Sequence, residues 1–121
     1  MKVYLAGPMR GYPNFNFPAF DAAARRLRAV GHEVFSPAER DRDKYGDIFQ
    51  TETGDESEVH EFSLREALAA DTAWITRHAD AVALLPGWER SKGAQAEAAL
   101  ALALGLPAEP VEVILAVPAI A

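Results

Sequence analysis

The feature that most constrains the fold is an alternation of two hydrophobic periods along the chain. Short apolar, β-prone segments are separated by longer segments in which apolar residues recur every three or four positions. Strand-like segments span residues 2–6, 32–36, 81–85 and 111–117, and helix-like segments span residues 16–31, 63–78 and 91–104. The order predicts an α/β fold, a compact, doubly wound, Rossmann-like parallel sheet of about four to five strands with helices on both faces.

Residues at the expected helix ends support this order. Asn16 is a candidate cap for the first helix, Pro18 is tolerated in its first turn, and Gly31 ends it. The stretch Ser63-Leu64-Arg65-Glu66 has the spacing of a capping box, and Gly105 follows the Ala/Leu-rich third helix.

The chain is expected to form one domain over residues 1–121, a size that suits a single compact core. Residues 39–62 keep neither period, so residues 40–62 are predicted to form an acidic lid or flexible loop. This region carries several acids and no Lys or Arg between Asp47 and Glu61. The acids are Asp47, Glu52, Asp55, Glu56, Glu58 and Glu61.

Composition excludes several classes of function. A net charge of −6 argues against binding a nucleic-acid polymer, which requires a basic face. The absence of cysteine excludes disulfides and thiolate metal sites, and His32, His60 and His78 lack metal-ligand spacing and are interpreted as surface residues. Neither a signal peptide nor a membrane span is recognisable, so we expect a cytoplasmic protein that works without a metal or other cofactor.

Loops after the first and third strands are the places to search for a ligand, because parallel sheets bind ligands beyond the carboxyl ends of their strands. The first loop offers Gly7, Arg10 and Gly11, which suit a close backbone approach to a phosphate or carboxylate. The second contains Ser91 and Gly93 and leads into a helix N-terminus that favours an anion. The alternative is that both are ordinary turns, since no complete nucleotide-binding fingerprint is present.

Two carboxylates fall where the helical period predicts burial. Asp71 shares a stripe with Leu64, Leu68 and Ile75, and Glu97 shares one with Gly93, Leu100 and Leu104. A buried pair of acids suggests glycosidase chemistry, with a nucleophile and an acid about 5 Å apart in the retaining geometry. The alternative is a scaffold role in which each acid is paired with Arg10, Arg77 or Lys92.

Two aromatic residues are further candidates for the site. Tyr4 lies in the first strand and could orient a carboxylate, although from the pattern alone a core tyrosine is the favoured interpretation. Trp88 could stack on a base or simply cover its loop.

Three separated segments resemble the nucleoside 2-deoxyribosyltransferase superfamily, most closely its phage-associated branch. They are Tyr4-Leu5-Ala6-Gly7-Pro8-Met9-Arg10-Gly11, Asp71, and the run from Leu85 to Glu97 with the sequence LPGWERSKGAQAE. The resemblance covers nearly the whole chain. It implies that Glu97 attacks the anomeric carbon, that Asp71 assists departure of the base, and that Tyr4 positions the nucleophile.

Ser91 bears on the substrate that the resemblance implies. Nucleoside transferases of the superfamily carry an aspartate six residues before the nucleophile, whereas the nucleoside 5′-monophosphate N-glycosidases carry a serine that accommodates phosphate. Ser91, together with Arg10 and Gly11, is similar to the monophosphate branch. We therefore expect an N-glycosidase that acts on a (deoxy)nucleoside 5′-monophosphate. The alternatives are a base-exchanging deoxyribosyltransferase, a non-catalytic nucleotide-binding module, and an interaction protein that uses the acidic segment.

Members of the superfamily complete their site with an Asn or Ser from a neighbouring subunit, well past the last strand. This chain has only Pro118-Ala119-Ile120-Ala121 there. The resemblance implies a homodimer or a higher homo-oligomer.

Overall fold

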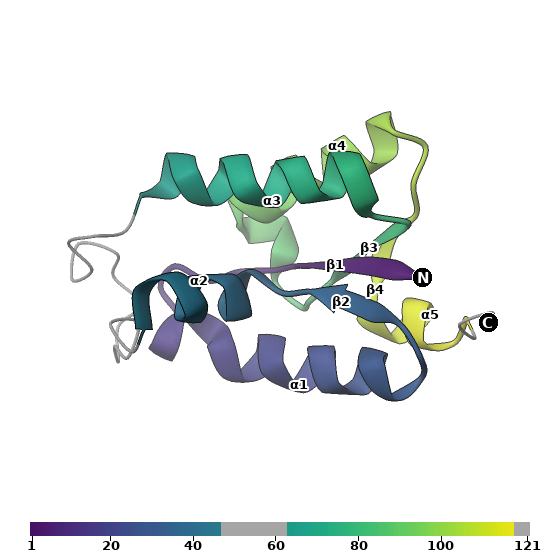
Figure 1. Ribbon diagram of the computed structural model, residues 1–121, viewed down its shortest axis with the longest axis horizontal. Helices are drawn as coiled ribbons and strands as arrows, with labels where there is room; N and C mark the ends of the chain where they lie inside the picture. The colour runs from purple at the N-terminus through teal and green to yellow at the C-terminus, as the bar shows by residue number, and fades with distance from the viewer. Residues whose placement is uncertain (47–62, 118–121) are drawn as a thin grey trace.

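A computed structural model describes residues 1–46 and 63–117 (Figure 1). Four short parallel strands form one sheet in the order β2-β1-β3-β4. The strands are β1 (Lys2–Ala6), β2 (Glu33–Phe35), β3 (Ala81–Leu84) and β4 (Ala108–Pro110). The helices are α1 (Phe17–Ala29), α2 (Pro37–Tyr45), α3 (Leu64–His78), α4 (Lys92–Ala103) and α5 (Val111–Leu115), and two 3₁₀ turns cover Pro13–Asn16 and Trp88–Arg90.

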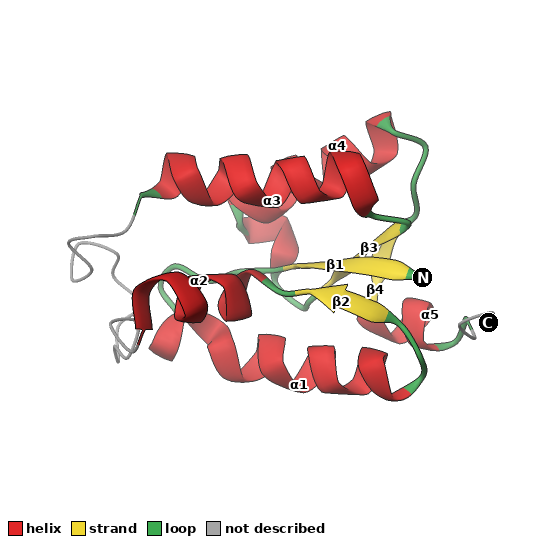
Figure 2. Ribbon diagram, viewed as in Figure 1, coloured by secondary structure: helices red, strands yellow, loops and turns green. Residues whose placement is uncertain are grey.

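The helices form a layer on each side of the sheet, which confirms the predicted α/β class (Figure 2). Helices α1 and α5 cover one face, and α3 and α4 cover the other (Figure 1). The chain winds outward from β1 to β2 and then in the opposite direction from β3 to β4. The direction therefore reverses between β1 and β3, and such a reversal is where open α/β sheets bind ligands.

β1 supplies both cores because its side chains alternate between the two faces. Val3 and Leu5 pack into the apolar cluster under α1 and α5, while Tyr4 and Ala6 pack into the cluster under α3 and α4. All four residues are fully buried. A strand without a solvated face is expected at the centre of a parallel sheet.

The strand predicted at residues 111–117 is wrong, because Val111–Leu115 is the helix α5 and the last strand is the shorter Ala108–Pro110. Val111 and Ile114 are buried, whereas Val113 between them is 45% exposed. This spacing of three is helical, and it cannot be distinguished from a strand pattern over so few residues. Pro110, which stands at the N-cap of α5, marks the change.

The interpretation of residues 39–62 as aperiodic is wrong for its first part, which belongs to α2. Pro37 occupies the first turn of this helix, Glu39 also lies in that turn, and Gly46 ends the helix with a φ of 69°. A proline and an acid at the start of a helix and a glycine just after its end are ordinary helix signals. The rest of the predicted lid, with the acidic segment, lies outside the described residues.

The predicted caps had mixed outcomes. Ser63 caps α3 by accepting a hydrogen bond from the Glu66 amide at 3.2 Å, as expected. The Glu66 carboxylate, however, pairs with Lys44 of α2 instead of completing a capping box. Asn16 does not cap α1; its side chain donates to the carbonyl of Pro8 at 3.0 Å.

His32 is a further correction, because it is buried rather than at the surface. Its Nδ1 atom lies 3.2 Å from the N-terminal amino group, which covers it. His78 is exposed as predicted, and His60 lies outside the described residues. Within the described part of the chain, no helix combines the length and the apolarity that crossing a bilayer requires.

Candidate active site

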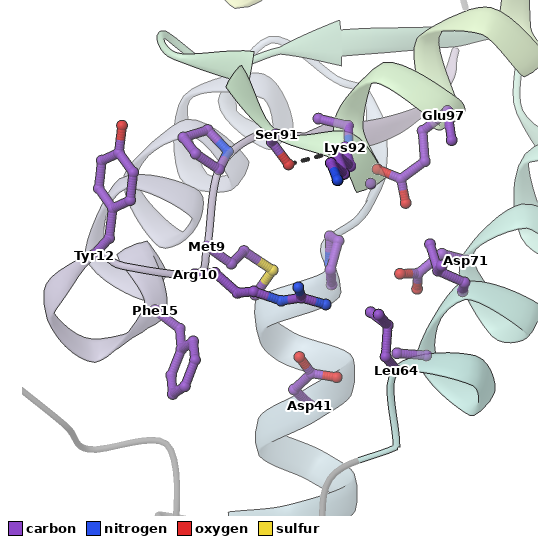
Figure 3. Close-up of a pocket in the computed structure, with 18 of the residues that line it drawn as sticks. Met9, Arg10, Tyr12, Phe15, Asp41, Leu64, Asp71, Ser91, Lys92 and Glu97 are labelled. Atoms are coloured by element: carbon purple, nitrogen blue, oxygen red, sulfur yellow. Dashed lines mark hydrogen bonds between the residues drawn. The ribbon is translucent and has the colours of Figure 1, made fainter. Parts of the chain in front are cut away.

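A pocket of about 700 Å³ opens beyond the carboxyl ends of β1 and β3 (Figure 3). Its walls come from the loop after β1, the first turns of α2 and α3, and the loop that leads into α4. Both loops singled out in the sequence thus contribute to one pocket at the reversal of strand order. Its volume lies within the range typical of small-molecule sites.

Glu97 of α4 lies at the wall of this pocket and is 6% exposed. The hydroxyl group of Tyr4 donates a hydrogen bond of 2.5 Å to its Oε2 atom. Tyr4 is held by two aromatic rings: it stacks on Phe35 with a centroid distance of 5.6 Å, and Trp74 packs against it in a tilted arrangement at 6.4 Å. The carboxyl group of Glu97 is therefore held in place by a rigid aromatic side chain. Tyr4 can reach it because side chains alternate along β1 and that of Tyr4 points to the face under α3 and α4.

Asp71 of α3 lines the same pocket and is 5% exposed. Figure 3 shows its carboxyl group and that of Glu97 extending from neighbouring helices into one space. The structure thus brings together the two acids that the helical period had marked as buried.

Burial raises the pKa of both acids. The pKa of Glu97 is raised to about 8, mainly by burial. The hydrogen bond from Tyr4 lowers this pKa, and the nearby charge of Asp71 raises it. The pKa of Asp71 is raised to about 6 by burial, while the positive charge of Arg40 lowers it. The pKa of Tyr4 is raised well above its usual value by burial and by the two carboxylates. Such a pair can hold one proton near neutral pH, which is the state that acid–base chemistry needs.

The cation paired with Asp71 is Arg40, not Arg10, Arg77 or Lys92. Its Nη1 atom donates to Oδ1 of Asp71 at 2.7 Å. Arg40 lies in α2, a helix that the sequence analysis missed. The Ser36-Pro37 start and the Gly46 end could have revealed the helix, but no sequence signal shows which of its arginines turns inward.

Arg90 and Lys92 flank the start of α4, and Arg10 reaches the same pocket from the loop after β1. Arg10, Arg90 and Lys92 all line the pocket, as do Ser91 and Gly93. The hydroxyl of Ser91 caps α4 by accepting a hydrogen bond from the Ala94 amide at 3.2 Å. The N-terminus of α4 and these side chains give this end of the pocket the character of an anion site.

The loop after β1 is strained where it enters the pocket wall. Asn14, Phe15 and Asn16 have φ values of 51°, 52° and 63°, in the left-handed region. Asparagine tolerates this region, but a bulky residue such as phenylalanine rarely adopts it. The conformation places the buried Phe15 at the pocket, opposite the acids (Figure 3).

Other predicted site residues take different places. Gly7 lines the pocket, but a Cβ atom there would lie 2.7 Å from Cβ of Leu85, so close packing of the two loops already requires glycine. Gly11 and Trp88 are not among the residues that line the pocket. Trp88 packs instead against the apolar cluster under α4.

Within residues 1–46 and 63–117, no group of three or more His, Asp or Glu side chains is arranged to hold a metal ion.

A family model described as Domain of unknown function (DUF4406) matches residues 1–109. The matched region contains every residue of the pocket described here. Comparisons with curated proteins and with solved structures gave no match.

Proposed function

The chain belongs to the family described as Domain of unknown function (DUF4406), and we propose that it is an N-glycosidase acting on a (deoxy)nucleoside 5′-monophosphate. The observation that carries the proposal is the buried pair Glu97 and Asp71 at one pocket wall, with Tyr4 bonded to Glu97. A carboxylate pair with opposed roles is the usual equipment of glycoside cleavage. The likeness of residues 4–11, Asp71 and residues 85–97 to the deoxyribosyltransferase superfamily supports the same reaction.

In the proposed reaction, ionised Glu97 attacks the anomeric carbon of the sugar. The carbon–nitrogen bond to the base breaks, its electron pair leaves with the base, and protonated Asp71 supplies the proton that the base accepts. Water then attacks the glycosyl ester and gives its proton to Asp71. The products are free base and sugar 5′-phosphate, and both carboxyl groups return to their starting states.

The pKa values make this cycle pH-dependent. Between about 6 and about 8 the pair holds a single proton. Because the pKa of Glu97 is the higher of the two, the proton resides mostly on Glu97 in the ligand-free pocket. The reactive form is the minor tautomer with the proton on Asp71 and the charge on Glu97, where the Tyr4 hydroxyl stabilises it. We expect a bell-shaped dependence of kcat/KM on pH with limbs near these two values, because activity follows the one-proton state.

The anion site at the start of α4 supports a phosphorylated substrate. Arg90 and Lys92 supply positive charge where α4 begins, and Arg10 adds a third positive charge to the same pocket as the two acids. A nucleoside monophosphate suits this combination of charges, since its phosphate is separated from the anomeric carbon by the sugar ring. An unphosphorylated nucleoside would leave the cations without a partner from the ligand.

The proposal is tested by incubating the protein with a panel of ribo- and deoxyribonucleoside monophosphates and measuring released base by chromatography. We expect release from at least one monophosphate and much slower release from the matching nucleoside. A second free base added to the reaction separates hydrolysis from transfer, because a transferase would form a new nucleotide. Absence of base release from every monophosphate would contradict the proposal.

Two variants test the phosphate assignment. Arg10→Ala is expected to weaken monophosphate binding by about 1.5–3 kcal/mol, the range for a charge-assisted hydrogen bond. Ser91→Asp places a carboxylate at the anion site, and the ratio of monophosphate to nucleoside activity should fall sharply. Arg26→Ala is the matched control, because Arg26 is paired with Glu112 on the opposite face of the sheet. An unchanged ratio in Ser91→Asp would show that the phosphate binds elsewhere.

The expected homodimer or higher oligomer and the cytoplasmic location belong to the same proposal. Light scattering coupled to size-exclusion chromatography tests the oligomer directly: a mass of one chain, 13.1 kDa, would exclude it.

A further inference from the structure

Arg40 contacts two buried carboxylates and a backbone carbonyl at once. Its Nη1 atom donates to Oδ1 of Asp71 at 2.7 Å and to the carbonyl oxygen of Ala67 at 2.9 Å. Its Nε atom donates to Oδ1 of Asp41 at 2.7 Å, and Nη2 lies 2.6 Å from the same oxygen. All three guanidinium nitrogens are therefore engaged.

These contacts fix the guanidinium group in space. The Arg40 side chain is only 16% exposed, and Asp41, which grips it from the same helix, is 2% exposed. The Ala67 carbonyl belongs to α3, one turn before Asp71, so Arg40 also ties α2 to α3. An arginine held by two acceptors, here Asp41 and the Ala67 carbonyl, loses little further freedom when it orients a third group, Asp71.

Asp71 is in turn oriented by Arg40. Nη2 of Arg40 also approaches Oδ2 of Asp71, at 3.5 Å, so both carboxylate oxygens face the guanidinium group. Rotation of the carboxyl group would break the 2.7 Å contact. Arg40 and Asp71 both line the pocket, so the constrained carboxyl group is one that a bound ligand would meet.

The positive charge of Arg40 acts on the whole carboxylate pair. It lowers the pKa of Asp71 and that of Glu97, in opposition to burial. The other groups facing Asp71 are Asp41 of α2, whose charge raises its pKa, and Tyr4 of β1, whose hydroxyl lowers it. Arg40 is the cation among these groups.

We propose that Arg40, gripped by Asp41 and the Ala67 carbonyl, is a positioning residue that holds the Asp71 carboxyl group at the pocket wall for proton transfer to the leaving base. The inference rests on the proposed glycosidase reaction. Under this inference α2 does more than pack on α3: it supplies the arginine that holds Asp71 in place.

The test compares Arg40→Gln with the matched control Arg42→Gln. Arg42 lies two positions further along α2, pairs with Asp21, and is not among the residues lining the pocket. Arg40→Gln should lower kcat for base release on the order of 10²-fold with a much smaller change in KM, as misplacement of a reacting group does. Both limbs of its pH profile should move to higher pH, because the charge that lowers both pKa values is gone. Arg42→Gln should keep kcat and both limbs.

Arg40→Lys and Asp41→Asn cover the case in which Arg40→Gln does not fold. Arg40→Lys retains the charge without the planar fork, so its limbs should stay in place while kcat falls. Asp41→Asn weakens the contacts that Asp41 makes with the Arg40 guanidinium, and it should lower kcat less than Arg40→Gln does. The inference would be overturned if the pH profile of Arg40→Gln kept its limbs at the wild-type positions. It would also be overturned if Arg40→Lys kept the wild-type kcat.

Carboxyl-carbon NMR titration separates this inference from the proposed function, because it needs no turnover. Asp71 should titrate at higher pH in Arg40→Gln than in the wild type, and at unchanged pH in Arg42→Gln. If the wild type released no base while this change was observed, the glycosidase proposal would fail and the coupling of Arg40 to Asp71 would stand. An unchanged Asp71 titration in Arg40→Gln would overturn the coupling, whatever the activity.

Discussion

The two faces of the sheet are both covered by helices, but they bury different chemistry. The face under α1 and α5 buries large apolar side chains, among them Val3, Leu5, Phe20 and Leu27. The face under α3 and α4 holds a smaller cluster of mainly alanine and short aliphatic residues around Tyr4. Asp71 and Glu97 are buried on the helices of this second face.

This difference separates stability from activity. Large apolar side chains on the α1 face contribute burial without any need for partners. On the α3 and α4 face, two carboxyl groups are removed from water, which costs free energy and raises their pKa values. Small side chains such as Ala94 and Ala98 bring α4 close enough for Glu97 to reach Tyr4. One face contributes apolar burial to stability, and the other holds the two acids that we propose to be reactive.

The largest expected effect comes from Glu97→Gln, which removes the proposed nucleophile from the face under α3 and α4. Turnover should fall by orders of magnitude, because an amide cannot form the glycosyl ester. Stability at neutral pH should stay equal or rise, since the neutral side chain can still accept the Tyr4 hydrogen bond. Base-release assays and thermal melts measure the two quantities. Near-normal turnover would show that the mechanism is wrong, and a loss of several kcal/mol would indicate a structural role for Glu97.

The matched change on the apolar face is Leu27→Ala. Leu27 is fully buried under the sheet on α1. Its truncation should cost about 2–5 kcal/mol of unfolding free energy, as cavity-forming substitutions do. Activity per folded molecule should be preserved, because no residue of α1 lines the pocket. A large loss of activity at temperatures where the variant is fully folded would contradict this distinction, because the face under α1 and α5 would then affect activity as well as stability.

Stability should also fall as pH rises, and the effect should come from the polar face. The folded protein holds protons on Asp71 and Glu97 up to pH values near 6 and 8, whereas the unfolded chain releases them near their ordinary pKa values. Folding is therefore more favourable below about pH 4 than at high pH. At about 1.4 kcal/mol per pKa unit this difference is on the order of 5–8 kcal/mol for the two acids together, and it is lost progressively as pH rises to about 8.

Urea unfolding at a series of pH values measures this slope. Glu97→Gln should flatten most of it, whereas Glu112→Gln, an exposed acid beside α1, should leave it nearly unchanged. A pH-independent wild type would mean that the two acids titrate normally.

The smallest expected effect is that of Tyr4→Phe, which removes the hydroxyl but keeps the ring in its stack with Phe35. The pKa of Glu97 should rise further, since the hydrogen bond lowers it. A hydrogen bond to a charged group contributes about 1.5–3 kcal/mol, so kcat/KM should fall about 10–10²-fold. Phe35→Leu serves as the control for the aromatic stack. Unchanged activity in Tyr4→Phe would remove the tyrosine from the mechanism.

Much of this arrangement could be predicted from the sequence, because strong periods reflect burial. The helical stripe that contains Leu68 and Ile75 correctly predicted that Asp71 is buried, and the uncharged run at β3 correctly predicted a central strand. Those patterns report which side of an element faces the core. The burial of Glu97 was predicted in the same way.

What the sequence did not show depends on contacts between distant segments. The inward turn of Arg40 is set by Asp41 and by the carbonyl of Ala67, which no local pattern encodes. The burial of His32 arises from the N-terminal amino group 31 positions away. The helix at Val111–Leu115 was missed because five residues are too few to separate a period of two from a period of three or four.

The most direct test of the account is whether Glu97 forms a covalent glycosyl intermediate. A 2′-fluoro-substituted deoxynucleoside 5′-monophosphate should trap it, because the fluorine destabilises the oxocarbenium-like transition states and slows hydrolysis of the adduct. We predict that intact mass rises by the sugar phosphate without the base, that peptide mapping places the adduct on Glu97, and that Glu97→Gln gains no mass. Saturable binding of the analogue with no adduct, together with no base released from any natural monophosphate, would contradict the account and leave a nucleotide-binding module.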